Sequence, residues 1–116
     1  NDNMVSNTAI TFDPAPPKSY AYCSDTAYFE QIIPQISNST LLYHEATFLQ
    51  QHAHLALKTM HSTSEQAAII AKKANVGTLL LGHYSGRYND YNEFKLQAQK
   101  IFTPTKLATD GTVFEI

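Results

Sequence analysis

A short apolar run that ends in a histidine constrains this chain more than any other feature. The residues Thr78–Gly82 (TLLLG) precede His83, and segments that favour turns flank them at residues 75–77 and 85–87. A short apolar run between turn formers predicts a strand buried on both faces. A side chain just past such a strand lies at the carboxyl edge of a sheet, where α/β proteins bind ligands. His83 is therefore either a hydrogen-bonded residue that ends a strand or part of a metal or catalytic site.

Two other segments have the same form. The aromatic residues Tyr20–Cys23 predict a strand that leads to Asp25, and residues 41–43 predict a second buried strand that leads to His44 and Glu45. Apolar residues recur with a helical period at residues 29–36, 49–60, 67–74 and 91–102. The resulting order is strand, helix, strand, helix, helix, strand, helix, strand. This alternation predicts an α/β fold with a mostly parallel sheet backed by helices.

Several residues mark the expected helix ends. Ser24 or Asp25 would cap the first helix, so Asp25 is either a capping carboxylate or a ligand. Pro34 would stop or kink that helix. Ser62 and Glu65 have the spacing of a capping box, which would place His61 directly before a helix N-terminus. Free amide groups at such a terminus favour anions such as phosphate, so His61 is either a surface residue or one that acts on a phosphodiester.

The ends of the chain differ from its middle. Residues 1–19 are polar and then rich in proline, which predicts an irregular arm with an edge strand at residues 9–12. Asp110-Gly111 predicts a tight turn before a closing strand at residues 112–116. We therefore expect an N-terminal arm at 1–19 and a single domain at 20–116.

Composition excludes several classes of function. The 116 residues suffice for one domain with a modest core, and the net charge of −2 excludes a general basic surface for nucleic acid. No apolar run approaches the length needed to span a bilayer, and the first residues are polar, unlike a signal peptide. The single cysteine, Cys23, excludes an internal disulfide and fits a reducing compartment, so we expect a cytoplasmic protein.

The side chains at the predicted strand ends have metal-binding chemistry. Asp25, Glu45 and His83 would meet at one sheet edge, with His61 at a helix entrance. Imidazole and carboxylate groups suit zinc, and a carboxylate that bridges paired ions suits phosphodiester cleavage. The chain has no HExxH motif and offers only two or three strong ligands, so the site is incomplete by this count. A nucleophile elbow of the GxSxG type and glycine-rich phosphate loops are absent from the sequence.

Three strings carry a resemblance to a known family. They are YAYCSDT at 20–26, HEATF at 44–48 leading to TMHST at 59–63, and LLGHYSGRY at 80–88. In this order and at these separations they resemble the C-terminal part of ribonuclease Z, the tRNA 3′-processing endonuclease of the metallo-β-lactamase superfamily. The resemblance covers the chain from about residue 19 onward. It implies the C-terminal half of an αββα sandwich, two zinc ions in the complete enzyme, and precursor tRNA as substrate.

The resemblance also implies roles for individual residues. Asp25 matches the aspartate that bridges the metals, and His83 matches the last histidine ligand. His61 matches a histidine that acts on the leaving group or the phosphate, and Glu45 matches the glutamate that orients this histidine. Ser85 and Arg87 match a loop near the substrate phosphate.

The chain departs from the family pattern in two ways. Tyr84 and Gly86 stand where the family usually has Phe and Ala, and neither change affects a ligand. The larger departure is that the family's HxHxDH motif and one further histidine ligand are absent. We therefore expect a fragment that is inactive by itself, whether or not it holds metal, that pairs with a missing N-terminal half, and whose parent protein is a homodimer. The alternatives are a non-catalytic binding or dimerisation half-domain and a different phosphodiesterase of the same superfamily.

Overall fold

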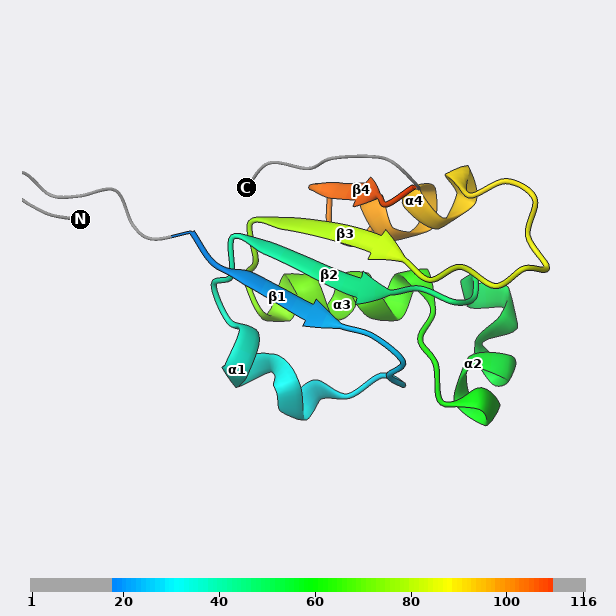
Figure 1. The fold of residues 1–116 in the computed structure, drawn as a ribbon, viewed down its shortest axis with the longest axis horizontal. Helices are drawn as coiled ribbons and strands as arrows, with labels where there is room; N and C mark the ends of the chain where they lie inside the picture. Colours follow the sequence, from blue (N-terminus) through cyan, green and yellow to red (C-terminus); the bar gives the residue numbers. More distant parts are fainter. Residues whose placement is uncertain (1–17, 110–116) are drawn as a thin grey trace, which may run out of the picture.

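A computed structural model describes residues 18–109 of the chain. The predicted edge strand at residues 9–12, almost all of the predicted arm, the turn at Asp110-Gly111 and the closing strand at 112–116 lie outside the described residues. Figure 1 shows the path of the described part, a sheet with helices packed against it. None of its helices is long and apolar enough to cross a membrane.

Four parallel strands form the sheet, in the order β1-β2-β3-β4. They are β1 (Tyr20–Cys23), β2 (Leu41–Glu45), β3 (Thr78–Gly82) and β4 (Thr105–Leu107). The first three confirm the predicted strands, although β2 continues through His44 and Glu45. The parallel sheet predicted from the alternation of strands and helices is also confirmed. β4 was not predicted, because a three-residue strand with a lysine at its centre has no clear apolar pattern.

Helices and helical turns connect the strands. They are the turn η1 (Glu30–Ile32), α1 (Ile33–Ile36), the turn η2 (Gln50–His52), α2 (Ala53–Thr59), α3 (Ser64–Lys73) and α4 (Asn92–Gln99). Three predicted helix ends are wrong. Phe29, and not Ser24 or Asp25, is the cap of the first helical turn. Pro34 lies in the first turn of α1, where its missing amide costs nothing, so it is compatible with the start of a helix instead of ending one. The capping box of α3 joins Thr63 and Gln66, one residue later than the predicted pair Ser62 and Glu65.

The two faces of the sheet are different. Sequential parallel strands joined by right-handed crossovers place all their connecting helices on one face. On that face Leu42, Leu79 and Leu81 pack with α3 and with Phe94 of α4 in the main core. The buried face of α3 is mostly alanine, which lets this helix lie close to the strands behind the sheet (Figure 1).

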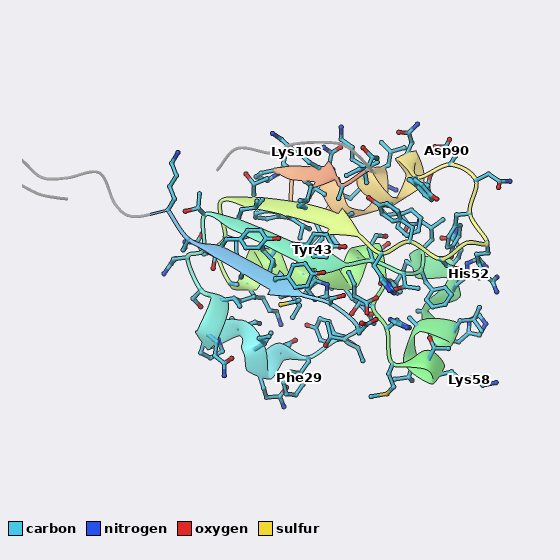
Figure 2. The ribbon with its side chains drawn as sticks, in the orientation of Figure 1. Phe29, Tyr43, His52, Lys58, Asp90 and Lys106 are labelled. Carbon is cyan, nitrogen blue, oxygen red and sulfur yellow. The ribbon has the colours of Figure 1, made fainter. Side chains whose placement is uncertain are left out.

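The opposite face carries tyrosines instead of helices. Tyr22 and Tyr43 stack on it with ring centroids 4.7 Å apart, and Tyr20 lies 6.5 Å from Tyr22. Figure 2 shows Tyr43 on this side of the sheet, over the strands. Tyr20 and Tyr22 are 52% and 62% exposed, which is high for large aromatic side chains on a sheet. Within residues 18–109, no helix covers this face of the sheet.

The core can be tested with a matched pair of leucines. Leu81 is fully buried in β3, whereas Leu57 of α2 is 73% exposed. Leu81→Ala should lower the free energy of unfolding by about 2–5 kcal/mol, because it removes buried methyl groups and leaves a cavity. Leu57→Ala should change it by less than about 0.5 kcal/mol. Urea unfolding of both variants measures this difference, and equal effects would contradict the described core.

Candidate metal centre

Three parallel strands end at the same edge of the sheet. Glu45 at the end of β2 pairs in register with Gly82 at the end of β3, and Cys23 at the end of β1 pairs with His44. His83 directly follows β3, and Asp25 follows β1 by two residues. The arrowheads of β1, β2 and β3 point toward this edge in Figure 1. The register therefore brings the predicted strand-end residues to one place.

The backbone at two of these residues is unusual. Asp25 has φ 52° and His83 has φ 61°, which is the left-handed region. A residue with a Cβ atom pays on the order of 1–3 kcal/mol for this conformation, and it persists where surrounding contacts hold it. The backbone thus turns sharply after β1 and after β3. Asp25 is not the cap of the first helical turn, because Phe29 occupies that position without a side-chain hydrogen bond.

A carboxylate and an imidazole face each other across the edge. His83 Nε2 lies 3.4 Å from Asp25 Oδ1, and both side chains are accessible to solvent. Asp25, Glu45, His61 and His83 each offer one ligand atom, and these four atoms lie within 4.8 Å of one another. Nitrogen and oxygen donors this close together fit a divalent ion such as zinc.

Glu45 is the best-connected side chain of the site. Its carboxylate is fully buried, and Oε1 accepts hydrogen bonds from the Thr26 amide at 2.7 Å and from His61 Nδ1 at 2.7 Å. Oε2 accepts from the Thr47 hydroxyl at 2.5 Å and from the Ser62 amide at 3.1 Å. A carboxylate has about four lone-pair positions, and these donors use all of them. Glu45 therefore fits the role of an orienting group better than that of a metal ligand.

The same four donors control the charge of Glu45. Burial by itself would raise the pKa of this carboxyl, but the hydrogen bonds from Thr47, His61, Ser62 and Thr26 outweigh burial and hold the pKa below its usual value. The carboxylate form is thus stabilised inside the fold.

His61 is held by one nitrogen and leaves the other available. Its Nδ1 is bonded to Glu45, and its ring lies against the ring of His83 with centroids 5.3 Å apart. Its backbone amide bonds to the Ala56 carbonyl of α2 after a left-handed residue, Met60. His61 is two residues from the cap of α3 at Thr63, and not directly before it as the predicted capping box implied.

The loop after His83 contains the other predicted site residues. The Ser85 amide bonds to the Thr47 carbonyl at 2.9 Å, and the Ser85 hydroxyl accepts from the Arg87 amide at 3.3 Å. The Arg87 guanidinium is exposed and lies 6.0 Å from the centre of the Phe48 ring. Among the residues that the structure describes, no carboxylate forms an ion pair with Arg87.

Three contributors to the site were not predicted from the sequence. Thr26 and Ser62 bind Glu45 through backbone amides, which carry no signal in the residue type. Thr47 lies two residues after Glu45, and this short spacing was the one feature of the sequence that could have indicated its contact with Glu45.

An open pocket of about 310 Å³ adjoins His83, and it is lined by Tyr43, Gly82, His83, Tyr84, Ala108 and Thr109.

Comparison with known proteins adds a family relationship. The chain is 50% identical over 99 residues to ribonuclease Z of Cytophaga hutchinsonii, which is 85% of this chain and 32% of the relative. It is also 50% identical over 108 residues to ribonuclease Z of Parabacteroides distasonis, which is 93% of this chain and 36% of the relative. The resemblance to ribonuclease Z is confirmed. The chain spans about a third of the length of these ribonuclease Z relatives. No protein-family model matches it.

Solved structures agree with this relationship. The metallo-β-lactamase fold protein YhfI from Bacillus subtilis matches with a TM-score of 0.77 and 29% identity, over 83% of this chain and 39% of that protein. The short form of human tRNase Z matches with a TM-score of 0.58 and 30% identity, over 72% of this chain and 27% of that protein. The predicted fold, part of a metallo-β-lactamase-type sandwich, is therefore confirmed.

The buried carboxylate of Glu45 makes a specific prediction about stability. In Glu45→Gln an amide nitrogen replaces one carboxylate oxygen, and this nitrogen can only donate. The donors that bonded to that oxygen therefore lose their acceptor. The variant should lose about 1–3 kcal/mol of unfolding free energy at pH 7. In the wild type, the contribution of Glu45 is present above its unfolded pKa, near 4.5, and is lost as the pH falls through its lower folded pKa.

Urea unfolding between pH 7 and pH 3 tests both parts. Glu93→Gln is the matched control, because Glu93 is exposed in the first turn of α4. The difference between wild type and Glu45→Gln should shrink toward acidic pH. A difference that stays constant with pH, or a control that behaves like Glu45→Gln, would contradict the assigned hydrogen bonds.

Proposed function

We propose that this chain is the C-terminal portion of a zinc-dependent endoribonuclease that removes the 3′ trailer from precursor tRNA. The observation that carries the proposal is the cluster of Asp25, Glu45, His61 and His83 in a chain that is 50% identical to ribonuclease Z proteins. Every one of these residues was expected at the site from the sequence, and their ligand atoms lie within 4.8 Å of one another.

Asp25 and His83 are the residues that would hold metal. Asp25 is exposed and its carboxylate faces His83 Nε2, whereas the Glu45 oxygens are already used by four donors. This donor set fits zinc. Bound zinc would polarise the scissile phosphate and lower the pKa of a water molecule that attacks it.

His61 and Glu45 would handle the proton. When water attacks the phosphorus, the bond to the 3′ oxygen of the tRNA breaks, and that oxygen needs a proton to become a hydroxyl group. Glu45 binds His61 Nδ1 and so orients the ring, which leaves Nε2 to deliver the proton. We assign the proton donor to His61 on this geometry.

Ser85 and Arg87 would contact the phosphate backbone. The Arg87 guanidinium is exposed and has no carboxylate partner within residues 18–109. A planar cation of this kind binds phosphate through two parallel hydrogen bonds. The bond from the Arg87 amide to the Ser85 hydroxyl holds the two residues in one turn.

The remaining ligands would come from another part of the protein. A zinc ion normally takes three or four protein ligands, and Asp25 and His83 supply two. The relatives are about three times as long as the stretch that matches this chain. The tyrosine-bearing sheet face is open, and we propose that the N-terminal half packs on it in a homodimeric cytoplasmic enzyme.

A second candidate is a different phosphodiesterase of the same superfamily. The YhfI structure covers more of this chain and has a higher TM-score than human tRNase Z, so the fold alone does not select the substrate. The non-catalytic alternative, a half-domain that only binds or dimerises, gives no function to the cluster of Asp25, Glu45, His61 and His83.

Cleavage assays separate these functions. The complete protein that carries this chain should cut precursor tRNA after the discriminator base, and the 116-residue chain alone should not, because it lacks ligands. Both proteins are incubated with zinc and labelled precursor tRNA, and bis(p-nitrophenyl) phosphate serves as a generic phosphodiester. Cleavage of only the generic ester would favour the second candidate, and robust tRNA cleavage by the chain alone would contradict the fragment hypothesis.

Substitutions distinguish ligands from the proton donor. Asp25→Ala and His83→Ala in the complete protein should lower zinc content and activity together, because ligands serve both. His61→Ala should retain zinc and lower kcat by about 10²–10⁴-fold, as expected for loss of a general acid. Zinc is measured by elemental analysis, with His54→Ala, an exposed histidine of α2, as control. Full zinc content in Asp25→Ala and His83→Ala would refute the ligand assignment, and zinc loss in His61→Ala would make His61 a ligand.

A further inference from the structure

One buried hydroxyl group lies between the candidate ligand His83 and the orienting carboxylate Glu45. Thr47 is 6% exposed, and its Oγ1 lies 2.5 Å from Glu45 Oε2 and 2.9 Å from His83 Nδ1. Thr47 comes directly after Ala46 in the loop that leaves β2. No role in the proposed reaction was assigned to Thr47 from the sequence.

The directions of these two hydrogen bonds follow from counting protons. Each Glu45 oxygen accepts from a backbone amide, and the four hydrogen bonds keep this carboxyl ionised, so it acts only as an acceptor toward its partners. The single hydroxyl proton of Thr47 must then point at Glu45. The Thr47 oxygen can only accept toward His83, so His83 Nδ1 must carry the proton of that bond.

This proton placement decides which nitrogen of His83 is free. A neutral imidazole carries one proton, so with Nδ1 protonated the lone pair lies on Nε2. Nε2 is also the atom that faces Asp25 Oδ1, at 3.4 Å. The nitrogen that must bind a metal at this edge is thus the one that Thr47 leaves unprotonated.

The backbone of Thr47 contacts the loop that follows His83. Its carbonyl accepts from the Ser85 amide at 2.9 Å, two residues after His83. This contact helps to keep the left-handed turn at His83. It does not use the Thr47 side chain, so removing the hydroxyl leaves this contact in place and removes only the bonds to Glu45 and to the His83 ring.

We propose that Thr47 is a positioning residue that selects the metal-binding tautomer of His83 and links His83 to the Glu45–His61 pair. The inference rests on the proposed function in one respect, that His83 binds metal. The resulting chain of hydrogen bonds runs from His83 through Thr47 and Glu45 to His61. It joins the candidate ligand to the proposed proton donor through side-chain hydrogen bonds.

Two variants of Thr47 separate the hydroxyl from the rest of the side chain. Thr47→Val keeps the shape and removes the hydroxyl, whereas Thr47→Ser keeps the hydroxyl and removes the methyl group. Thr59→Val is the control, since Thr59 is exposed and its hydroxyl bonds within α2 to the Leu55 carbonyl. All variants are made in the complete protein that carries this chain.

The first measurement reads the tautomer directly. Nitrogen-15 NMR of the imidazole groups is recorded on the metal-free protein at pH 8, with the His83 signals assigned through His83→Gln. Wild type, Thr47→Ser and Thr59→Val should show protonated Nδ1 at His83, and Thr47→Val should show a mixture with protonated Nε2. Predominantly protonated Nε2 in the wild type would overturn the proposal, whether or not Thr47→Val folds.

The second measurement reads metal affinity. Zinc competition with a chromophoric chelator should give about 10–100-fold weaker binding in Thr47→Val, the usual cost of losing a group that orients a ligand. Thr47→Ser should bind zinc close to wild type. Equal losses in both variants would indicate a purely structural role and would overturn the proposal, as would unchanged zinc affinity in Thr47→Val.

The two proposals fail in different ways. A wild-type protein that binds no zinc would contradict the proposed function, while the tautomer measurement on metal-free protein would still decide the link between Thr47 and His83. Zinc binding and tRNA cleavage with no dependence on the Thr47 hydroxyl would leave the proposed function intact and refute the role of Thr47.

Discussion

The hydrogen bonds of one buried carboxylate connect all parts of the candidate site. Glu45 ends the second strand, and it accepts from a loop after the first strand, from its own loop and from the segment before α3. A buried carboxylate without these donors would carry a large desolvation cost. Because the four donors come from three separate segments, satisfying Glu45 also fixes where Asp25, His61 and His83 lie relative to one another.

The topology explains why this edge of the sheet is the chemical one. Parallel strands added in sequence bring the carboxyl ends of β1, β2 and β3 together, and the loops that follow them carry the polar groups. The same strand order places the helices on one face and leaves Tyr20, Tyr22 and Tyr43 on the other. One topological fact therefore yields both an assembled edge and an open face. In our proposal the open face receives the segment that completes the metal site.

The site combines rigid and accessible groups. Glu45 and Thr47 are buried, and their hydrogen bonds are satisfied within the described structure. Asp25 and His83 are exposed, and both have a left-handed backbone at the end of a strand. Buried groups that orient exposed donors are a typical arrangement around metal ligands. Glu45 lies as close to the other candidate ligand atoms as Asp25 does, yet it is buried and its lone pairs are occupied by four donors, whereas Asp25 is exposed.

The sequence by itself determined the first three strands, the alternation with helices, the family resemblance and the identity of the four clustered side chains. These features depend on the period of apolar residues along the chain and on strings of neighbouring residues, which are local properties. The tertiary structure alone decided the capping pair of α3, the position of Pro34 in the first turn of α1, the left-handed turns at Asp25 and His83, and the place of Thr47. Thr47 meets a partner 36 residues away, and Ser62 meets Glu45 across 17 residues. Such contacts arise from strand register and backbone direction, which the pattern of residue types does not encode.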